Sequence, residues 1–152
     1  MLKSGADPNA KDSSGKTCLH HLVLRNLMDE ELIDLLILSG ASPDITDNDG
    51  NTPLLLAASL QEIETTLLES RNRELMKKLI LAGANIDKTD SKGQTSLHCA
   101  AYLRKREAVR LLLSEGALPN ISDELGNTPL ICALTDNYPY SWKIGWLFYQ
   151  KY

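Results

Sequence analysis

Two series of glycines recur along the 152-residue chain and constrain its fold more than any other feature. In the first series a Gly-Ala pair closes an apolar run, at Gly5, Gly40, Gly83 and Gly116. In the second series a glycine opens a Gly-x-Thr-x-Leu phrase, at Gly15, Gly50, Gly93 and Gly126. Each glycine of the second series follows one of the first series by 10 residues, whereas the interval from there to the next glycine of the first series is 25, 33 or 23 residues. The chain is therefore built from repeated units, in which a link of fixed length alternates with a segment that tolerates insertion.

Each unit carries the signals of two helices. A threonine two residues after each opening glycine is placed to cap the first helix with its hydroxyl, and Pro53 and Pro129 follow at the first helical position. Apolar residues three and four apart then indicate a second helix near 32–36, 75–80 and 109–113. The next Gly-Ala glycine suits a left-handed C-cap, and the aspartates and asparagines of the fixed link are typical of tight turns. The pattern predicts an all-α solenoid of helix-turn-helix units joined by β-hairpin loops.

Three phrases of the chain resemble ankyrin repeats. They are Thr-Pro-Leu-Leu-Leu-Ala-Ala at 52–58, Thr-Ser-Leu-His-Cys-Ala-Ala at 95–101 and Gly-Ala-Leu-Pro-Asn-Ile-Ser-Asp at 116–123. The interval of 33 residues from Gly93 to Gly126 matches the period of about 33 residues in that family. The resemblance covers residues 1–135 and implies about three full units, with partial units at both ends. We place a partial unit at 1–12, units at 13–47, 48–90 and 91–123, and the start of a fourth from 124.

The unit from Gly50 to Gly93 holds ten residues more than this period, and the constant link places them between its two helices. Leu60, Ile63, Leu67 and Leu68 continue an apolar stripe at helical spacing. We expect the first helix to run on by about two turns and to turn back near residues 71–72. A surface loop is the alternative. In both cases the insert should project from the helix-turn edge, away from the hairpins.

Both ends of the chain depart from the pattern. Residues 1–4 align only with the end of a second helix, which leaves the helix pair at 17–38 uncovered; we therefore expect a fragment or truncated product of a longer array. Seven of the eight aromatic residues lie within 138–152. Trp142 and Trp146, four residues apart after Pro139, suit one face of a helix that closes the last unit. We thus assign 136–152 as a non-repeat aromatic cap, with a non-homologous tail or a membrane-surface anchor as alternatives.

Composition and residue spacing argue against a nucleic-acid-binding, membrane-spanning, disulfide-bonded or catalytic protein. The pI near 5.3 disfavours a nucleic-acid partner, and no run approaches the about 18 apolar residues of a transmembrane helix. Cys99 and Cys132, at equivalent positions, sit on helices about 8–10 Å apart, beyond the roughly 7 Å reach of a disulfide. The resemblance gives His20 and His98 a structural role, bonded to backbone and threonine hydroxyl. We expect no enzyme, no cofactor and no metal, in an intracellular chain (cytoplasm or nucleus) that is monomeric or part of a longer one.

The resemblance implies that the hairpin tips and the exposed face of each unit's first helix bind a protein or peptide partner. Our main candidates are Arg25, Tyr102 and Leu125. The further candidates are His21, Leu56, Leu60, Asn48, Asp49, Asn51, Lys92, Gln94, Glu124 and Asn127. Two alternatives are a structural spacer within a larger ankyrin-repeat protein and a short inhibitor resembling those of Rel-type transcription factors. A basic cluster at 104–106 and 110 is interpreted as a solvated face, with a second docking site as its alternative.

Overall fold

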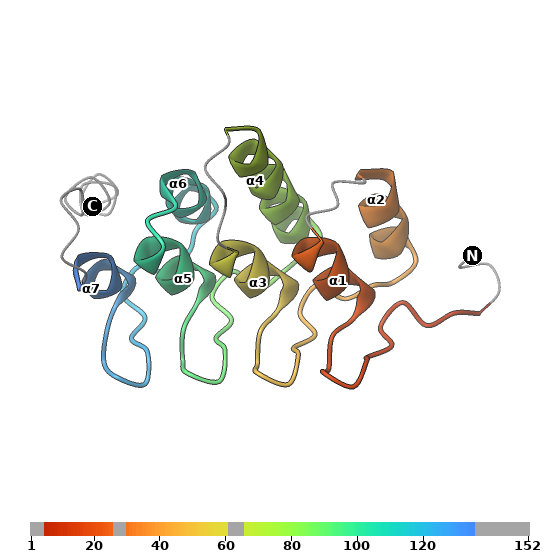
Figure 1. Ribbon diagram of the computed structural model, residues 1–152, viewed down its shortest axis with the longest axis horizontal. Coiled ribbons are helices and arrows are strands. Elements are labelled where there is room, and N and C mark those ends of the chain that lie inside the picture. The colour runs from red at the N-terminus through yellow and green to blue at the C-terminus, as the bar shows by residue number, and fades with distance from the viewer. Residues whose placement is uncertain (1–4, 26–29, 61–65, 136–152) are drawn as a thin grey trace.

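The computed structural model describes residues 5–25, 30–60 and 66–135, which form seven helices and no strand (Figure 1). The helices are α1 (Cys18–Leu24), α2 (Glu30–Leu38), α3 (Pro53–Ser59), α4 (Thr66–Leu81), α5 (Ser96–Tyr102), α6 (Arg106–Ser114) and α7 (Pro129–Leu134). The predicted all-α repeat solenoid is confirmed. The predictions for Ile63 and for the aromatic segment 136–152 lie outside the described residues.

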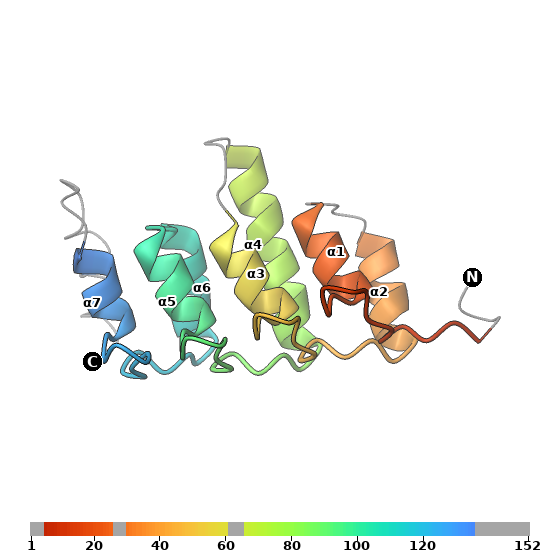
Figure 2. The same ribbon diagram turned by 60° about the horizontal axis from the view of Figure 1, so that its bottom comes forward.

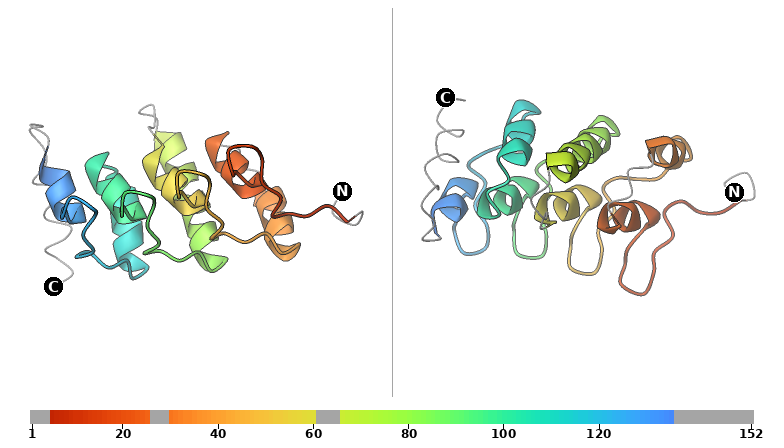
Figure 3. Two further views of the ribbon diagram at one scale, coloured as in Figure 1. Left: turned by 90° about the horizontal axis from the view of Figure 1, so that it is seen from below. Right: turned by 45° about the horizontal axis from the view of Figure 1, so that its top comes forward.

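The helices stand in two rows above a line of hairpins. The inner row is α1, α3, α5 and α7, in which each helix contacts the next, and the outer row is α2, α4 and α6 (Figures 1 and 2). The hairpins hang from the same side of the inner row, as the view from below also shows (Figure 3). The repeated units therefore lie side by side along one axis, with hairpins and inner helices forming one continuous surface.

The helix ends are fixed by the residues that the sequence pattern singles out. The hydroxyl oxygens of Thr52, Thr95 and Thr128 accept the backbone N–H groups of the residues three positions later, at 3.2 to 3.4 Å. At the other end Gly40 adopts φ +91°, and the next N–H, of Ala41, donates to Leu36 O at 2.9 Å. Gly83 and Gly116 repeat this left-handed C-cap. Local chemistry thus sets both boundaries of the helix pairs.

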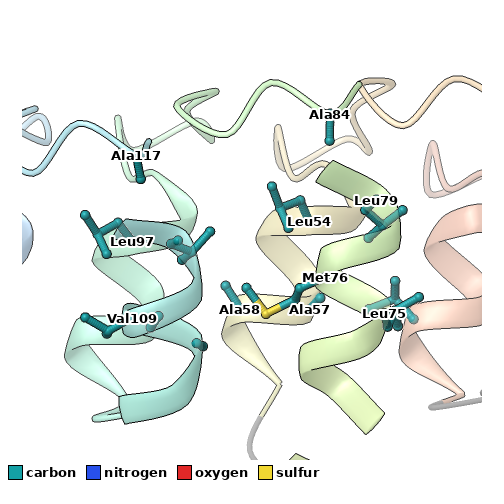
Figure 4. Packing of buried hydrophobic residues seen from close by; sticks show 14 of the residues in the cluster. Leu54, Ala57, Ala58, Leu75, Met76, Leu79, Ala84, Leu97, Val109 and Ala117 are labelled. Carbon is teal, nitrogen blue, oxygen red and sulfur yellow. The ribbon is translucent and has the colours of Figure 1, made fainter. Parts of the chain in front are cut away.

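The core runs through the stack between the two rows. Leu54 and Leu97 of the inner helices and Leu75, Met76 and Leu79 of α4 are at most 1% exposed (Figure 4). Fully buried alanine pairs follow the leucines in α3 and α5, at 57–58 and 100–101. Because alanine carries only a methyl group, neighbouring helices can approach closely there.

The extra residues of the second unit lengthen its second helix. α3 has seven residues, like α1 and α5, and ends where Leu60 turns extended at ψ 124°. α4 instead has 16 residues, and Arg71 and Asn72 lie inside it. The side chain of Asn72 is buried and its Nδ2 donates to Ala57 O at 2.9 Å, which joins the extended α4 to α3. The predicted extension of the first helix is therefore wrong. The predicted direction is confirmed, because α4 rises past the other helices away from the hairpins (Figure 2).

Candidate partner-binding surface

Each hairpin is closed by the side chain of one aspartate. Oδ1 of Asp47 accepts the N–H groups two and four residues later, at 3.0 and 2.8 Å, and Asp123 does the same. Asp12 and Asp90 repeat the arrangement. Burial of Asp47 acts to raise its pKa, but the hydrogen bonds from the backbone and side chain of Asn51 outweigh it and hold the pKa below its usual value. Ionised carboxylates therefore bind the backbone N–H groups of the turns, which would otherwise be hydrogen-bonded only to water.

The four hairpins are also bonded to one another; we call residues 12–16, 47–51, 90–94 and 123–127 the hairpin row. The N–H groups of Asn48, Ser91 and Glu124 donate to backbone oxygens of the preceding hairpin at 3.1, 3.2 and 3.0 Å. The approach is so close that a Cβ on Gly50 would lie 2.6 Å from Ser91 N. Backbone bonds therefore align the hairpin tips as one preformed surface.

Two buried histidines fix the hairpin row to the inner helices. Nδ1 of His20 accepts the N–H of Thr17 at 3.1 Å and lies 2.8 Å from its hydroxyl, while Nε2 donates to Asn51 O at 3.0 Å. His98 repeats these contacts with Thr95 and Asn127. Both rings are at most 1% exposed. The structural role that the resemblance implied for these histidines is the one observed.

The predicted residues of the hairpin row fall into two groups. The side chains of Asn48, Asp49, Lys92, Glu124 and Leu125 are exposed at the tips. Their charges change sign from the second hairpin to the fourth, from Asp49 to Lys92 to Glu124.

The remaining three predicted residues of the hairpin row, Asn51, Gln94 and Asn127, are half-buried. The side-chain amides of Asn51 and Asn127 donate to the hairpin carboxylates, at 3.2 to 3.3 Å. These two asparagines therefore support the surface more than they present a contact.

On the inner row, Arg25 and Tyr102 are exposed, the latter to 53%. His21 is exposed, and its Nε2 lies 2.8 Å from Oδ2 of Asp12 in its own hairpin. Leu56 and Leu60 are half-buried and pack against the core. These residues belong to the inner helices or directly follow them, and the row of inner helices stands above the hairpins (Figure 1).

One set of exposed residues escaped the sequence interpretation. Leu24, Ser59 and Thr135 occupy the same repeat position as Tyr102, and all four are exposed. The signal was present in the sequence, because these residues follow the capping threonines by seven positions in every unit. The inner row therefore presents a varied Leu, Ser, Tyr, Thr series alongside the residues that we predicted.

The cysteines offer no activated nucleophile in the described part of the chain. Cys18, Cys99 and Cys132 are free thiols. Burial raises the pKa of all three, that of Cys99 to about 12, and a protonated thiol is a poor nucleophile.

Within residues 5–25, 30–60 and 66–135, no group of three His, Cys, Asp or Glu side chains is placed to hold a metal ion. None of the described helices is both long and apolar enough to cross a membrane.

Stacked helix pairs with bonded hairpins define a helical repeat solenoid. A family model for ankyrin repeats in three copies matches residues 1–71 and again 67–144, and the chain belongs to this family. It is also similar to a curated viral protein described as an ankyrin repeat protein, from Acanthamoeba polyphaga mimivirus. That match is 40% identical over 50 residues, which are 33% of this chain and 12% of the relative. The chain thus spans only a small part of the relative's length.

Proposed function

We propose that this chain is a non-enzymatic binding module that recognises a protein or peptide through the hairpin row and the exposed side of the inner helices. Ankyrin repeats generally serve as protein–protein interaction modules. The observation that carries the proposal is the bonding of neighbouring hairpins to one another, which supports a contact surface already ordered without a partner. A preformed surface loses little conformational entropy on binding, so more of the contact energy remains as affinity.

The exposed side chains of this surface suit recognition of a polypeptide. Tyr102 and Leu125, exposed to 53% and 86%, offer apolar contact area at two separate places. Arg25, like tyrosine, belongs to the residue types that carry much of the energy in protein interfaces. The alternating charges at Asp49, Lys92 and Glu124 fix the position of a bound polypeptide along the hairpin row, because a shifted partner would place like charges opposite one another.

The test is affinity capture from an extract with the whole chain, followed by measurement of the captured partner's Kd. The triple variant Arg25→Ala, Tyr102→Ala, Leu125→Ala should weaken binding at least tenfold, since interface energy is concentrated in few residues. Its thermal unfolding should change little, because all three side chains are exposed. A matched control replaces Leu35, Arg71 and Leu118 by alanine; these side chains are exposed and lie outside the hairpin row and the inner helices, so the Kd should stay unchanged. Equal Kd values for the triple variant and the unchanged chain would contradict the assignment.

A second candidate function, a segment of a longer repeat array, is favoured by exposed positions at the N-terminal end of the stack. Ala41, Ala84 and Ala117 are buried beneath their helix pairs, whereas the equivalent Ala6 is exposed. Leu32 is 36% exposed, while Leu75, at the same repeat position in α4, is 1% exposed. Adding a helix pair before residue 5 should raise the Tm if these positions accept a further unit. An unchanged Tm would remove this support.

A further inference from the structure

The outer row carries cations at matching repeat positions. Arg73 and Lys77 of α4 are four residues apart, and Arg106 and Arg110 of α6 follow them by 33 residues each. All four side chains are exposed, and the buried faces of both helices lie on other positions. We call these four residues the outer basic patch.

The two helices of the patch contact each other, so its two pairs of cations lie side by side. A spacing of four residues is about 6 Å along a helix, and packed helices are about 8–10 Å apart. Exposed carboxylates compete only weakly for these cations: Arg73 lies 3.4 Å from Glu74, and Arg110 lies 3.2 Å from Glu107. Such surface pairs are worth little and exchange readily with a partner.

This charge arrangement is specific to the α4 and α6 units. In α2 the position equivalent to Lys77 and Arg110 is Asp34, whose carboxylate binds Lys78 at 2.8 Å. The predicted cluster at 104–106 and 110 is also divided by the fold. Arg104 and Lys105 are half-buried, and Lys105 Nζ donates to Ala57 O at 3.3 Å. The accessible patch is thus made by two helices rather than by one turn.

An exposed leucine of α4 borders the patch, and α2 carries a leucine at the same repeat position. Leu81, one turn beyond Lys77, is 75% exposed, and Leu38 at the same repeat position of α2 is 85% exposed. Most exposed leucines in a folded domain are scattered, so a repeated, nearly uncovered leucine beside a group of cations is informative.

We propose that the outer basic patch and the neighbouring leucines form a second interaction surface, which binds an acidic polypeptide segment that also carries apolar residues. The carboxylates of the segment pair with the four cations, and its apolar residues cover Leu81 and Leu38. This surface lies on the outer row, whereas the hairpin row and inner helices carry the proposed function (Figure 3). The two proposals therefore stand or fall separately.

The carboxylates within this surface favour a polypeptide over other anions. Glu74, Glu107 and Asp34 lie among or beside the cations, so a uniformly charged membrane or nucleic-acid backbone would meet repulsive as well as attractive contacts. A polypeptide can place single carboxylates opposite single cations and leave neutral residues opposite the acids. The overall charge of −4 likewise disfavours phosphate-rich partners.

The test uses a glutamate-rich peptide with regularly spaced leucines, labelled for fluorescence anisotropy, and a copy with glutamine in place of glutamate. The whole chain should bind the glutamate peptide in a salt-dependent manner and the glutamine peptide at least tenfold more weakly. The variant Lys77→Gln, Arg110→Gln should lose about tenfold in affinity. The matched control Lys11→Gln, Lys88→Gln removes the same charge outside both proposed surfaces, since these lysines donate to the backbone oxygens of Thr46 and Asp44, and it should bind as the unchanged chain does.

Three results would overturn the proposal. They are equal losses in the two double variants, equal binding of both peptides, and tighter binding to phosphatidylserine vesicles or to a DNA duplex than to the glutamate peptide. The last result would assign the patch to a membrane or a nucleic acid. Thermal unfolding of each variant separates these outcomes from loss of the fold. Failure here leaves the Kd measurement with the Arg25, Tyr102 and Leu125 variant unaffected.

Discussion

Nε2 of His20 lies 3.0 Å from the backbone oxygen of Asn51, 31 residues further along the chain. Since Nδ1 of the same ring accepts the N–H of Thr17, one buried neutral imidazole joins the start of α1 to the next hairpin. His98 makes the equivalent connection to Asn127, whereas Leu55 and Ile131 occupy this position in the other two units. Two units of the stack are therefore linked to the following hairpin by a histidine.

Replacing this link should destabilise the fold. His20→Leu removes the partner of Thr17 N–H and of Asn51 O, and losing a buried partner costs about 1–3 kcal/mol. We expect the free energy of unfolding in urea to fall by that amount. His21→Leu, on the exposed side of α1, is the control and should change it by less than about 0.5 kcal/mol. Equal effects of the two substitutions would show that the buried bonds contribute nothing.

The same residue should make stability depend on pH. Burial lowers the pKa of His20, so the folded state resists a proton that the unfolded chain accepts below about pH 6.5. The stabilisation is therefore complete above this pH and decreases as the pH falls through it. Urea midpoints at pH 7 and pH 5 should differ less for His20→Leu than for the unchanged chain. Identical differences would contradict a neutral, buried His20.

Alanine substitutions at Gly50 and Gly126 distinguish the effect of contact between hairpins on stability from the effect of backbone strain. Their φ angles are +84° and +80°, so an alanine at either position costs about 1–2 kcal/mol in conformation. Only at Gly50 does the new Cβ also meet the next hairpin, 2.6 Å from Ser91 N, whereas nothing lies within 4 Å at Gly126. Calorimetry should show Gly50→Ala lowering the Tm clearly more than Gly126→Ala. A larger effect at Gly126 would exclude tight contact between the hairpins.

Replacing the buried aspartate of a hairpin should destabilise the fold more than replacing the exposed aspartate at its tip. Asp47 is 6% exposed and accepts two backbone N–H groups, so Asp47→Ala should cost about 1–3 kcal/mol. Asp49→Ala at the exposed tip should cost less than about 0.5 kcal/mol. Because the folded pKa of Asp47 is lowered, its contribution is present above about pH 4 and is lost as the pH falls below that. Acid unfolding of the Asp47→Ala variant should accordingly be less steep.

Local chemistry explains which parts of the fold the sequence predicts. Capping by Thr52 and termination at Gly40 depend on neighbouring residues alone, and both helix boundaries follow from the pattern. Apolar spacing from Leu60 to Leu68 fits either of two antiparallel helices, so it could not assign the added residues to α4. Burial of Asn72 against Ala57, a tertiary contact, is what settles that assignment.

The candidate surface was predicted less completely than the fold, for a related reason. Repeat positions show which residues share a face, and they placed Asp49, Lys92 and Leu125 at exposed tips. They do not show which polar side chains are engaged within the fold. Asn51 and Asn127 resemble contact residues by position, yet their amides donate to the hairpin carboxylates.

The carbonyl oxygen of Ala57, near the end of α3, accepts two side-chain donors. Asn72 Nδ2 of α4 lies 2.9 Å away, and Lys105 Nζ, at the start of α6, lies 3.3 Å away. Because either donor can satisfy this buried carbonyl, removal of one should be partly compensated by the other. Asn72→Ala and Lys105→Met should therefore each cost less than a separate hydrogen bond of this kind would.

The double variant Asn72→Ala, Lys105→Met should be destabilised by more than the two single changes together, with a coupling of about 0.5–2 kcal/mol. Urea unfolding of the four proteins of this double-mutant cycle measures the coupling. Arg71→Ala, exposed on the same helix as Asn72, replaces Asn72→Ala in the control cycle and should give additive effects. Additive losses in the first cycle would mean that Asn72 and Lys105 do not share the carbonyl, and that the contact from α4 to α3 does not depend on the third unit.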